Sequence, residues 1–277
     1  MGDERVAEGM ELLACGRDRL DLTDPGSIPR ALDALQPDVV ISCAAFTAVD
    51  AAENERSSAF RINGDAPGWL GTACAERNIQ VVHISTDYVF DGAGDRPYLP
   101  TDPVGPTGVY GASKLAGEQA LLTALPGASI VRVGWLYDRL GSNFLNTMLR
   151  LAGERDRLTV VDDQWGCPTH CGDFAADLLR WVRLGAQDAQ AVAGTHHYGH
   201  EGITTWHGFA SAILSERAPD VSVDPVTSDA FPTPAKRPAY SKLDERAFFG
   251  RIGTTPISWK MALKRCLDAK FAEDPHP

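Results

Sequence analysis

The chain has 277 residues, which suits one large or two modest domains and leaves ample chain to bury a core. Its formal net charge of -11 at pH 7 argues against nucleic acid or an anionic membrane as a partner, because a phosphate surface requires a basic face. No apolar run reaches the roughly eighteen residues of a membrane helix, and the charged first residues lack the apolar core of a signal peptide, so a cytoplasmic protein is expected.

The first predicted elements are a strand, a turn and a helix. A short apolar run at residues 10–15 predicts a strand, residues 16–25 predict its exit and a turn, and Ser27 caps a helix over residues 28–35. In a dinucleotide-binding sheet, residues that leave the second strand meet the adenosine half of the cofactor. Arg17 is therefore a candidate for contact with a cofactor 2′-phosphate, although a solvated arginine explains it equally well.

Strands and helices then alternate. Residues 39–45 predict a strand that runs out into small side chains, where a cofactor could lie close to the backbone. Helices are predicted at residues 51–53 and 63–74, and a buried strand at residues 79–84. This alternation is typical of right-handed βαβ units, so the predicted fold class is α/β, with a Rossmann-like doubly wound parallel sheet.

The strand at residues 79–84 ends in two hydroxyls and a carboxylate, those of Ser85, Thr86 and Asp87. Ligands bind at the carboxyl ends of strands in open α/β sheets. Thr86 is therefore a candidate site residue.

Tyr110 and Lys114 stand one turn apart at the start of a predicted helix over residues 112–122. A cation beside the phenol would depress its pKa from about 10 toward working pH and make it a usable proton donor. A half-buried ring beside a solvated amine is the structural alternative. The preceding strand that ends in Thr86 favours the catalytic interpretation.

Two further features adjoin this site. The loop at residues 91–108 exceeds a routine connection and is expected to form a flap. Trp135 follows a predicted strand at residues 129–133 and is a candidate to stack on a substrate ring or sugar, with core packing as the alternative. The remaining predicted elements are helices at residues 143–151, 173–184, 205–214 and 258–271 and strands at residues 158–161 and 194–198.

The regular alternation decays beyond residue 185. The expected division is a Rossmann-like NAD(P)-binding region over residues 1–160 and a mainly substrate-binding region over residues 161–277, with some segments returning to the sheet. His196, His197, His200 and His207 form the densest histidine group, but no convergent ligand set and no Cys-x-x-Cys pair accompany them. No metal site is predicted, and the six cysteines are expected to be reduced.

Five motifs together resemble the dTDP-4-dehydrorhamnose reductase family of the extended short-chain dehydrogenase/reductase superfamily, over residues 9–277. Two of them are specific, because generic dehydrogenases lack them: Asp-Gln-Trp-Gly-Cys-Pro-Thr at 163–169 and Arg-Pro-Ala-Tyr-Ser-Lys-Leu-Asp at 237–244. The others are Cys-Ala-Ala-Phe-Thr-Ala-Val-Asp-Ala-Ala-Glu at 43–53, Ser-Thr-Asp-Tyr-Val-Phe-Asp-Gly at 85–92 and Tyr-Gly-Ala-Ser-Lys-Leu-Ala-Gly-Glu at 110–118.

The resemblance implies reduction of the 4-keto group of a dTDP-4-dehydro-6-deoxysugar with NADPH or NADH, taking dTDP-4-dehydro-L-rhamnose to dTDP-L-rhamnose. It implies catalytic roles for Thr86, Tyr110 and Lys114, and substrate contacts for Thr86, Asp87 and Trp135. The implied cofactor-binding residues are Arg17, Asp21, Leu22, Ala44, Ala45, Thr47, Tyr110 and Lys114. A homodimer is compatible with the resemblance.

The sequence departs from the family pattern at its N-terminus. Members open with a strand and a glycine-rich turn that receives the cofactor pyrophosphate at a helix N-terminus, whereas residues 1–8 resemble the tail of that first helix. The expectation is weak NADPH binding and lower stability. A start placed too far downstream and a genuinely shortened protein without reductase activity both explain this pattern.

Two other functions remain open. The motifs loosely resemble the reductase-like regulatory partner of methionine adenosyltransferase, a non-catalytic binding subunit. They also fit another dTDP-deoxysugar 4-ketoreductase of antibiotic biosynthesis. Titration with NADPH and with dTDP separates the first alternative from an enzyme, and a substrate panel separates the second.

Overall fold

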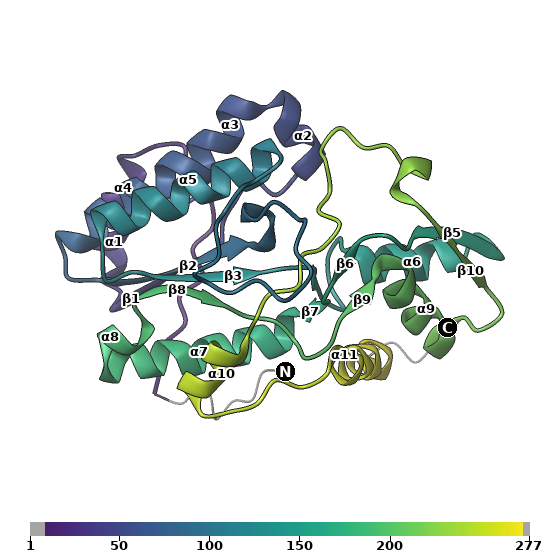
Figure 1. The fold of residues 1–277 in the computed structure, drawn as a ribbon. Coiled ribbons are helices and arrows are strands. Elements are labelled where there is room, and N and C mark those ends of the chain that lie inside the picture. Colours follow the sequence, from purple (N-terminus) through teal and green to yellow (C-terminus); the bar gives the residue numbers. More distant parts are fainter. Residues whose placement is uncertain (1–8, 274–277) are drawn as a thin grey trace.

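The computed structural model describes residues 9–273, and residues 1–8 and 274–277 lie outside it. The predicted helix tail at residues 1–8 therefore falls outside the described residues. Figure 1 shows two groups of elements side by side, a parallel sheet between helices on the left and a smaller group of helices and strands on the right. Each group has its own hydrophobic core.

The first group is built on a four-stranded parallel sheet in the order β1-β2-β3-β8. The strands are β1 (Val39–Ser42), β2 (Gln80–Thr86), β3 (Ser129–Val133) and β8 (Gly194–His197). In the register, Ser42 lies beside His83, and Ser85 lies beside Arg132. Because the strands are parallel, their carboxyl ends meet at one edge of the sheet.

Helices cover both faces of this sheet (Figure 1). Those on one face are α1 (Ser27–Leu35), α4 (Ala66–Ala75) and α5 (Val109–Ala124). Those on the other face are α7 (Cys171–Gln187), α8 (Ala189–Val192) and α10 (Arg246–Ile252). Val81 packs toward the first set and Val82 toward the second, as successive strand side chains must. The predicted doubly wound α/β fold is confirmed.

The predicted strand at residues 10–15 is wrong. These residues form no strand, and the Leu12 and Leu13 side chains are 62% and 50% exposed. A strand needs partners for its backbone N–H and C=O groups, but β1 is the edge strand of the described sheet and pairs only with β2. The predicted helix does form, but Ser27 is its first residue and not its N-cap, which is Gly26. The Ser27 hydroxyl donates instead to the Asp21 carbonyl oxygen (2.6 Å).

Short helical segments lead from β1 to α4. They are α2 (Val49–Asn54), α3 (Arg56–Phe60) and a π-helical turn, η1 (Arg61–Asp65). A π-turn inserts an extra residue into a helix and is frequent at functional sites.

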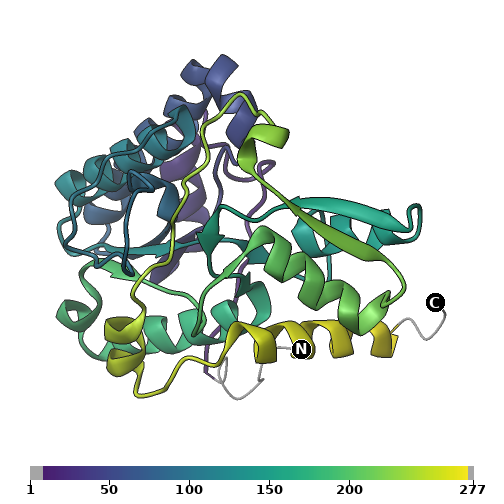
Figure 2. The ribbon, with the colours of Figure 1, turned by 45° about the vertical axis from the view of Figure 1, so that its right-hand side comes forward.

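The second core lies on the right of Figure 1, and Figure 2 turns that side forward. Its larger elements are α6 (Phe144–Ala152), β5 (Arg157–Val161), α9 (Trp206–Arg217), β10 (Ser222–Val226) and α11 (Trp259–Glu273). β5 and β10 pair in parallel, and Phe209, Ile213 and Leu263 lie at the centre of the core. Two-residue strands join the two groups: β4 (Leu136–Tyr137) pairs with β7 (Thr169–His170), and β6 (Trp165–Gly166) with β9 (Thr204–Thr205).

The chain passes between the two cores several times. α6 and β5 belong to the second core, whereas α7 and β8, which follow them, return to the first. A division near residue 160 stays a prediction, and it would separate α6 and β5 from the elements they pack against. Within residues 9–273, no helix combines the length and apolarity needed to cross a membrane.

A buried polar layer lies between the sheet and α5. Arg132 of β3 donates two hydrogen bonds to the Glu118 carboxylate of α5, from Nε to Oε1 (2.9 Å) and from Nη2 to Oε2 (2.7 Å). Both side chains are buried. A bidentate pair of this kind is directional, so it fixes the rotation of α5 over the sheet. Lys114 lies one turn earlier, on the same side of the helix.

Removing one partner of this pair should destabilise the fold strongly. We expect Glu118→Leu to lower the free energy of unfolding by about 3–5 kcal/mol, because the Arg132 guanidinium stays buried without its counter-charge. The double variant Glu118→Leu/Arg132→Met should lose much less, since no buried charge remains. Urea unfolding followed by circular dichroism measures both, and equal losses would show that the ion pair is not what the single variant breaks.

Candidate active site

Thr86 is the last residue of β2, as predicted, and its side chain is buried. Its hydroxyl donates to Asp87 Oδ1 (3.0 Å) and accepts a hydrogen bond from the Tyr88 backbone N–H (3.2 Å). The second bond caps the 3-10 turn Asp87–Val89 (η2). Thr86 is thereby held at the carboxyl edge of the sheet, where ligands bind in this class of fold.

Two polar atoms beside Thr86 are buried without a hydrogen-bond partner in the described part of the chain: Ser85 Oγ and Asp87 Oδ2. Most buried polar atoms are paired, so such atoms at a strand end mark a place where a ligand could supply the partner. Burial raises the pKa of Asp87 to about 6, against hydrogen bonds that lower it. At neutral pH its carboxylate is therefore mainly ionised and accepts hydrogen bonds.

Tyr110 is the second residue of α5, and two contacts hold the start of that helix. Glu53 of α2 accepts the Val109 backbone N–H (2.8 Å), which has no partner within the helix. Gly111 lies against η2, where a Cβ atom would be 2.1 Å from the Tyr88 carbonyl oxygen. The absence of a side chain at Gly111 lets α5 approach the end of β2 and brings Tyr110 to it.

The expected depression of the Tyr110 pKa by Lys114 is not found. Burial raises the pKa of Tyr110 to about 12, and a hydrogen bond with Thr86 opposes this only in part. The reason lies in the direction of the Lys114 side chain, whose ammonium donates to the Ile84 carbonyl oxygen (2.7 Å) and to His83 Nε2 (3.1 Å). Tyr110 therefore stays protonated throughout the physiological pH range.

Lys114 is only 2% exposed. Burial lowers the pKa of Lys114 to about 8, and nearby Glu118 and Cys43 oppose the shift. The ammonium is the main form at neutral pH. It carries three N–H donors, of which two are engaged by β2, so within residues 9–273 one is left to bind a ligand.

Ala44, Ala45 and Thr47 lie in the loop that follows β1, at the same edge of the sheet as Thr86. Ala44 and Thr47 are exposed, and Ala45 is half-buried. The structure thus brings the small residues predicted to line a cofactor to the edge that carries Thr86 and Lys114.

Asn63 shapes this edge, although the sequence marks it only as the start of a predicted helix. Its buried amide accepts the Phe46 N–H (2.7 Å) and donates to the Phe46 carbonyl oxygen and to Ser113 Oγ (both 3.0 Å). Asn63 thus ties the loop after β1 to α5. Gly117 permits this contact, because a Cβ there would be 1.9 Å from the Asn63 carbonyl oxygen. The π-turn around Asn63 becomes visible only in the structure.

The residues predicted to meet the adenosine half of a cofactor lie in the turn before α1. Asp21 Oδ1 accepts the Thr23 N–H (2.8 Å) and hydroxyl (2.7 Å), and Leu22 packs on the first core. Arg17 is exposed and pairs with Asp21 (3.2 Å). The three predicted residues therefore share one local structure, and their contact with a cofactor stays a prediction.

Trp135 follows β3 in a left-handed backbone conformation, with φ at 52°. Its indole stacks on Trp206 of α9, with ring centroids 3.6 Å apart and planes inclined by 5°. Gly166 lies against the same indole, since a Cβ there would come within 2.5 Å of it. A left-handed bulky residue is uncommon and is often found at functional sites. The protein itself supplies a stacking partner, and contact of Trp135 with substrate stays a prediction.

A cavity of about 830 Å³ lies beside Trp206, in the second core. Phe144 and Phe231 contribute apolar walls, and Lys236 and Arg237 contribute positive charge. Its volume falls in the range of small-molecule sites, which are mainly apolar with a few placed polar groups.

Arg237 connects this cavity to the active-site edge. Its Nη2 donates to Asp50 Oδ2 (2.6 Å). Burial raises the pKa of the nearby Tyr88 phenol to about 12, and the charge of Arg237 acts against this rise by lowering that pKa. The Tyr88 ring lies 5.6 Å from that of Tyr110. Its Nη1 is buried and has no partner among residues 9–273. A guanidinium with an unused buried donor is suited to an anionic group of a ligand.

The loop at residues 91–108, expected to be a flap, is held in place at Tyr98. The Tyr98 backbone exchanges hydrogen bonds with Lys242 (2.9 Å) and Asp244 (2.8 Å). Its ring stacks on Phe90 at 4.2 Å, and its hydroxyl donates to Asp91 (2.6 Å). The loop is therefore braced against the motif at 237–244 on the C-terminal side.

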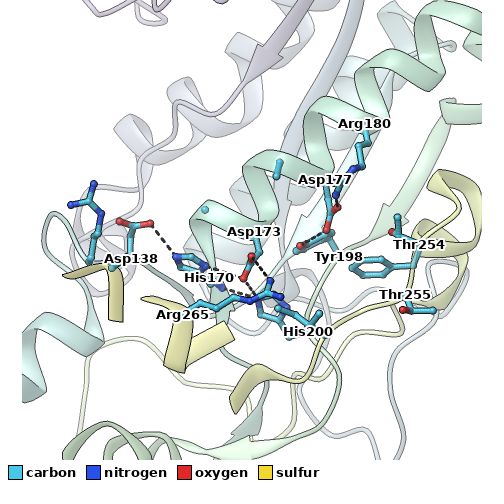
Figure 3. Close-up of a pocket in the computed structure, with 16 residues that line it drawn as sticks. Asp138, His170, Asp173, Asp177, Arg180, Tyr198, His200, Thr254, Thr255 and Arg265 are labelled. Atoms are coloured by element: carbon cyan, nitrogen blue, oxygen red, sulfur yellow. Dashed lines mark hydrogen bonds and ion pairs between the residues drawn. The ribbon is translucent and has the colours of Figure 1, made fainter. Parts of the chain in front are cut away.

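A second cavity, of about 470 Å³, lies at the start of α7 (Figure 3). Its charged groups pair with one another: His170 Nδ1 lies 2.9 Å from Asp173 Oδ2, and Asp177 accepts bonds from Arg180 (2.6 Å) and Tyr198 (3.0 Å). None of the predicted site residues lines it. Across the described residues, no group of three or more His, Cys, Asp or Glu side chains is arranged to hold a metal ion.

The chain matches the family model described as RmlD substrate binding domain over residues 3–271. It is 42% identical over 273 residues to the dTDP-4-dehydrorhamnose reductase of Mycobacterium tuberculosis, which covers 96% of this chain and 87% of that protein. A protein of the same name from Streptomyces griseus is 41% identical over 264 residues, with coverages of 94% and 86%.

Solved structures show the same similarity. The dTDP-4-dehydrorhamnose reductase of Clostridium acetobutylicum gives a TM-score of 0.87 at 36% identity, over 96% of this chain and 93% of that chain. The reductase of Bacillus anthracis, solved in complex with NADP, gives 0.87 at 33% identity, with coverages of 96% and 94%. The chain therefore belongs to the dTDP-4-dehydrorhamnose reductase family.

Proposed function

We propose that this chain reduces the 4-keto group of a dTDP-4-dehydro-6-deoxysugar with NADPH, and that it converts dTDP-4-dehydro-L-rhamnose to dTDP-L-rhamnose. The observation that carries the proposal is the convergence of Thr86, Tyr110 and Lys114 at the carboxyl end of β2. A hydroxyl, a phenol and a buried ammonium at one strand end can bind a carbonyl oxygen and protonate it. Membership of the family supports the choice of substrate and cofactor.

Tyr110 is the proton donor in this proposal. The cofactor, when bound, supplies the hydride that reduces the carbonyl carbon. Tyr110 donates a hydrogen bond to the carbonyl oxygen, and Thr86 does so once its hydroxyl has turned from Asp87 to the substrate. These bonds strengthen as negative charge develops on the oxygen. An alkoxide is a stronger base than a phenolate, so Tyr110 can give up its proton even with its pKa raised to about 12.

The carboxyl edge of the sheet fits the nicotinamide half of the cofactor. Ala44 and Thr47, which follow β1, have small, exposed side chains, and the buried Ser85 Oγ has no partner in the described chain. Lys114 has one N–H left to hold the ribose. Further along, Ala44, Ala45 and Thr47 would line the middle of the cofactor, and Arg17, Asp21 and Leu22 the adenosine half.

The substrate is proposed to extend from this edge into the second core. Its sugar would meet Thr86, Asp87 and Trp135, and its diphosphate the unused Nη1 of Arg237. The cavity of about 830 Å³ would take the thymidine, because aromatic walls suit a base. Along this path the sugar, the diphosphate and the thymidine follow one another in the order in which they are joined in a dTDP-sugar.

We place the reaction in the cytoplasm, since all six cysteines are free, as in reducing compartments. A homodimer stays a prediction.

Tyr110→Phe tests the proton donor. We expect kcat to fall by about 100-fold to 10,000-fold, the usual contribution of a general acid, while the Kd for NADPH stays unchanged. Tyr240→Phe, in a ring that packs on Tyr98 (6.2 Å), is the matched control and should retain turnover. NADPH oxidation with dTDP-4-dehydro-L-rhamnose is the assay. Full activity of Tyr110→Phe would refute the assignment, and an inactive wild type that binds neither NADPH nor dTDP would refute the function.

Trp135→Ala tests the substrate contact. We expect it to raise KM for the dTDP-sugar more than it lowers kcat, because stacking binds the ground and transition states alike. Trp69→Ala, at a tryptophan packed on the first core, is the control for loss of an indole. Steady-state kinetics at saturating NADPH separates KM from kcat. An effect confined to kcat would count against a binding role for Trp135.

A further inference from the structure

His83 is a buried histidine in the middle of β2, between the apolar residues Val82 and Ile84. It lies on the face of β2 that packs against α4 and α5, together with Val81, and it is only 1% exposed. Burying an imidazole costs free energy unless both ring nitrogens find partners. The neighbouring core is apolar and would favour an aliphatic side chain at this position. The hydrogen-bond partners of His83 therefore indicate what a histidine contributes here.

Those partners form a continuous chain from β1 to α5. The register places Ser42 of β1 directly beside His83, and Ser42 Oγ lies 3.1 Å from His83 Nδ1. On the other side of the ring, His83 Nε2 lies 3.1 Å from Lys114 Nζ. An ammonium can only donate, so Nε2 must accept, and the ring proton must sit on Nδ1 and point to Ser42.

We propose that His83, oriented by Ser42, is a positioning residue for Lys114. It keeps the Lys114 amine charged and points it in the direction needed to hold the cofactor ribose. This proposal rests on the role of Lys114 in the proposed function. Lys114 has two acceptors on β2. The Ile84 carbonyl oxygen belongs to the backbone and would be present whatever the side chains are, whereas the second acceptor, His83 Nε2, depends on a histidine at position 83.

Among residues 9–273, His83 is the side chain that hydrogen-bonds the Lys114 ammonium. Besides His83, the titratable groups that act on Lys114 come from α5 and from the residue after β1: Glu118 and Cys43. Both Glu118 oxygens accept hydrogen bonds from Arg132, so Glu118 contributes charge but is already engaged. Burial and the Lys114 cation lower the pKa of His83 well below its ordinary value, so the ring stays neutral and available as an acceptor.

The tautomer of His83 tests the proposal without any turnover. In the wild-type chain carrying isotope-labelled histidine, NMR should show His83 neutral with its proton on Nδ1. His196 is an internal control: its Nε2 faces the carbonyl oxygens of Val192 (3.1 Å) and Ala193 (3.0 Å), so it should carry the proton on Nε2. Lys114→Met should change the His83 signals and leave those of His196 in place. A His83 proton on Nε2 in the wild type would overturn the proposal.

Kinetics supplies the functional readout. The charged form of Lys114 is lost as pH rises through its pKa, so kcat/KM should fall on the basic side. His83→Leu removes an acceptor that favours the ammonium. The fall of kcat/KM at high pH, the basic limb of the pH profile, should therefore move to lower pH by about one unit. His83→Gln, which keeps an acceptor for Lys114 and a donor for Ser42, should restore the limb toward its wild-type position. His196→Leu, at a buried histidine outside the chain of contacts, should leave the limb unmoved.

The two measurements separate failure of this inference from failure of the proposed function. A wild type that shows the Nδ1 tautomer and its dependence on Lys114 supports the positioning of the amine even if the chain does not reduce dTDP-4-dehydro-L-rhamnose. An active wild type whose basic limb is the same in His83→Leu overturns the inference and leaves the reductase proposal standing.

Discussion

The placement of α5 over the sheet is the constraint on which the site depends. Two buried charged groups of this helix meet the strands below it: Glu118 pairs with Arg132 of β3, and Lys114 bonds to His83 and the Ile84 carbonyl oxygen of β2. Buried charges tolerate little displacement, because a shift that breaks their hydrogen bonds leaves them unsolvated. The position of the Tyr110 phenol at the end of β2 follows from this anchoring, since it stands one turn before Lys114 on the same helix.

Contacts between residues far apart in the sequence join the carboxyl edge of the sheet to the C-terminal motif at 237–244. Asp50 of α2 binds Arg237 and the Ala235 N–H, and the Tyr98 backbone pairs with residues of the motif at 237–244. These contacts place Arg237 between the strand end and the large cavity. The motifs at 43–53 and 237–244 are thus joined in one structure. In the proposed function, the motif at 110–118 supplies the proton donor Tyr110, and the motif at 237–244 faces the rest of a nucleotide-linked substrate.

Local patterns were enough to predict most helices, the four strands of the main sheet, β5 and the end of β2 at Thr86, because hydrophobic periodicity and spacing are local properties. They did not predict β10 or the two-residue strands β4, β6, β7 and β9. They failed for residues 10–15, whose apolar run resembles a strand but has no paired neighbour in the described sheet. They also failed for the pKa of Tyr110, because the Lys114 amine bonds to the Ile84 carbonyl oxygen and to His83, two residues about thirty positions away in the sequence, and not to Tyr110. The bonds of Asn63 and the stacking of Trp135 on Trp206 are likewise long-range contacts that no local signal reveals.

The most direct test of this account follows the hydride itself. With NADPH that carries deuterium at the transferable position of the nicotinamide, and with dTDP-4-dehydro-L-rhamnose as substrate, the wild-type chain is expected to form dTDP-L-rhamnose with one deuterium at C4 of the sugar. Mass spectrometry and NMR of the isolated nucleotide sugar measure the amount and the position of the label. Deuterium at another carbon, or no reduced sugar from a folded chain that binds both ligands, would contradict the account.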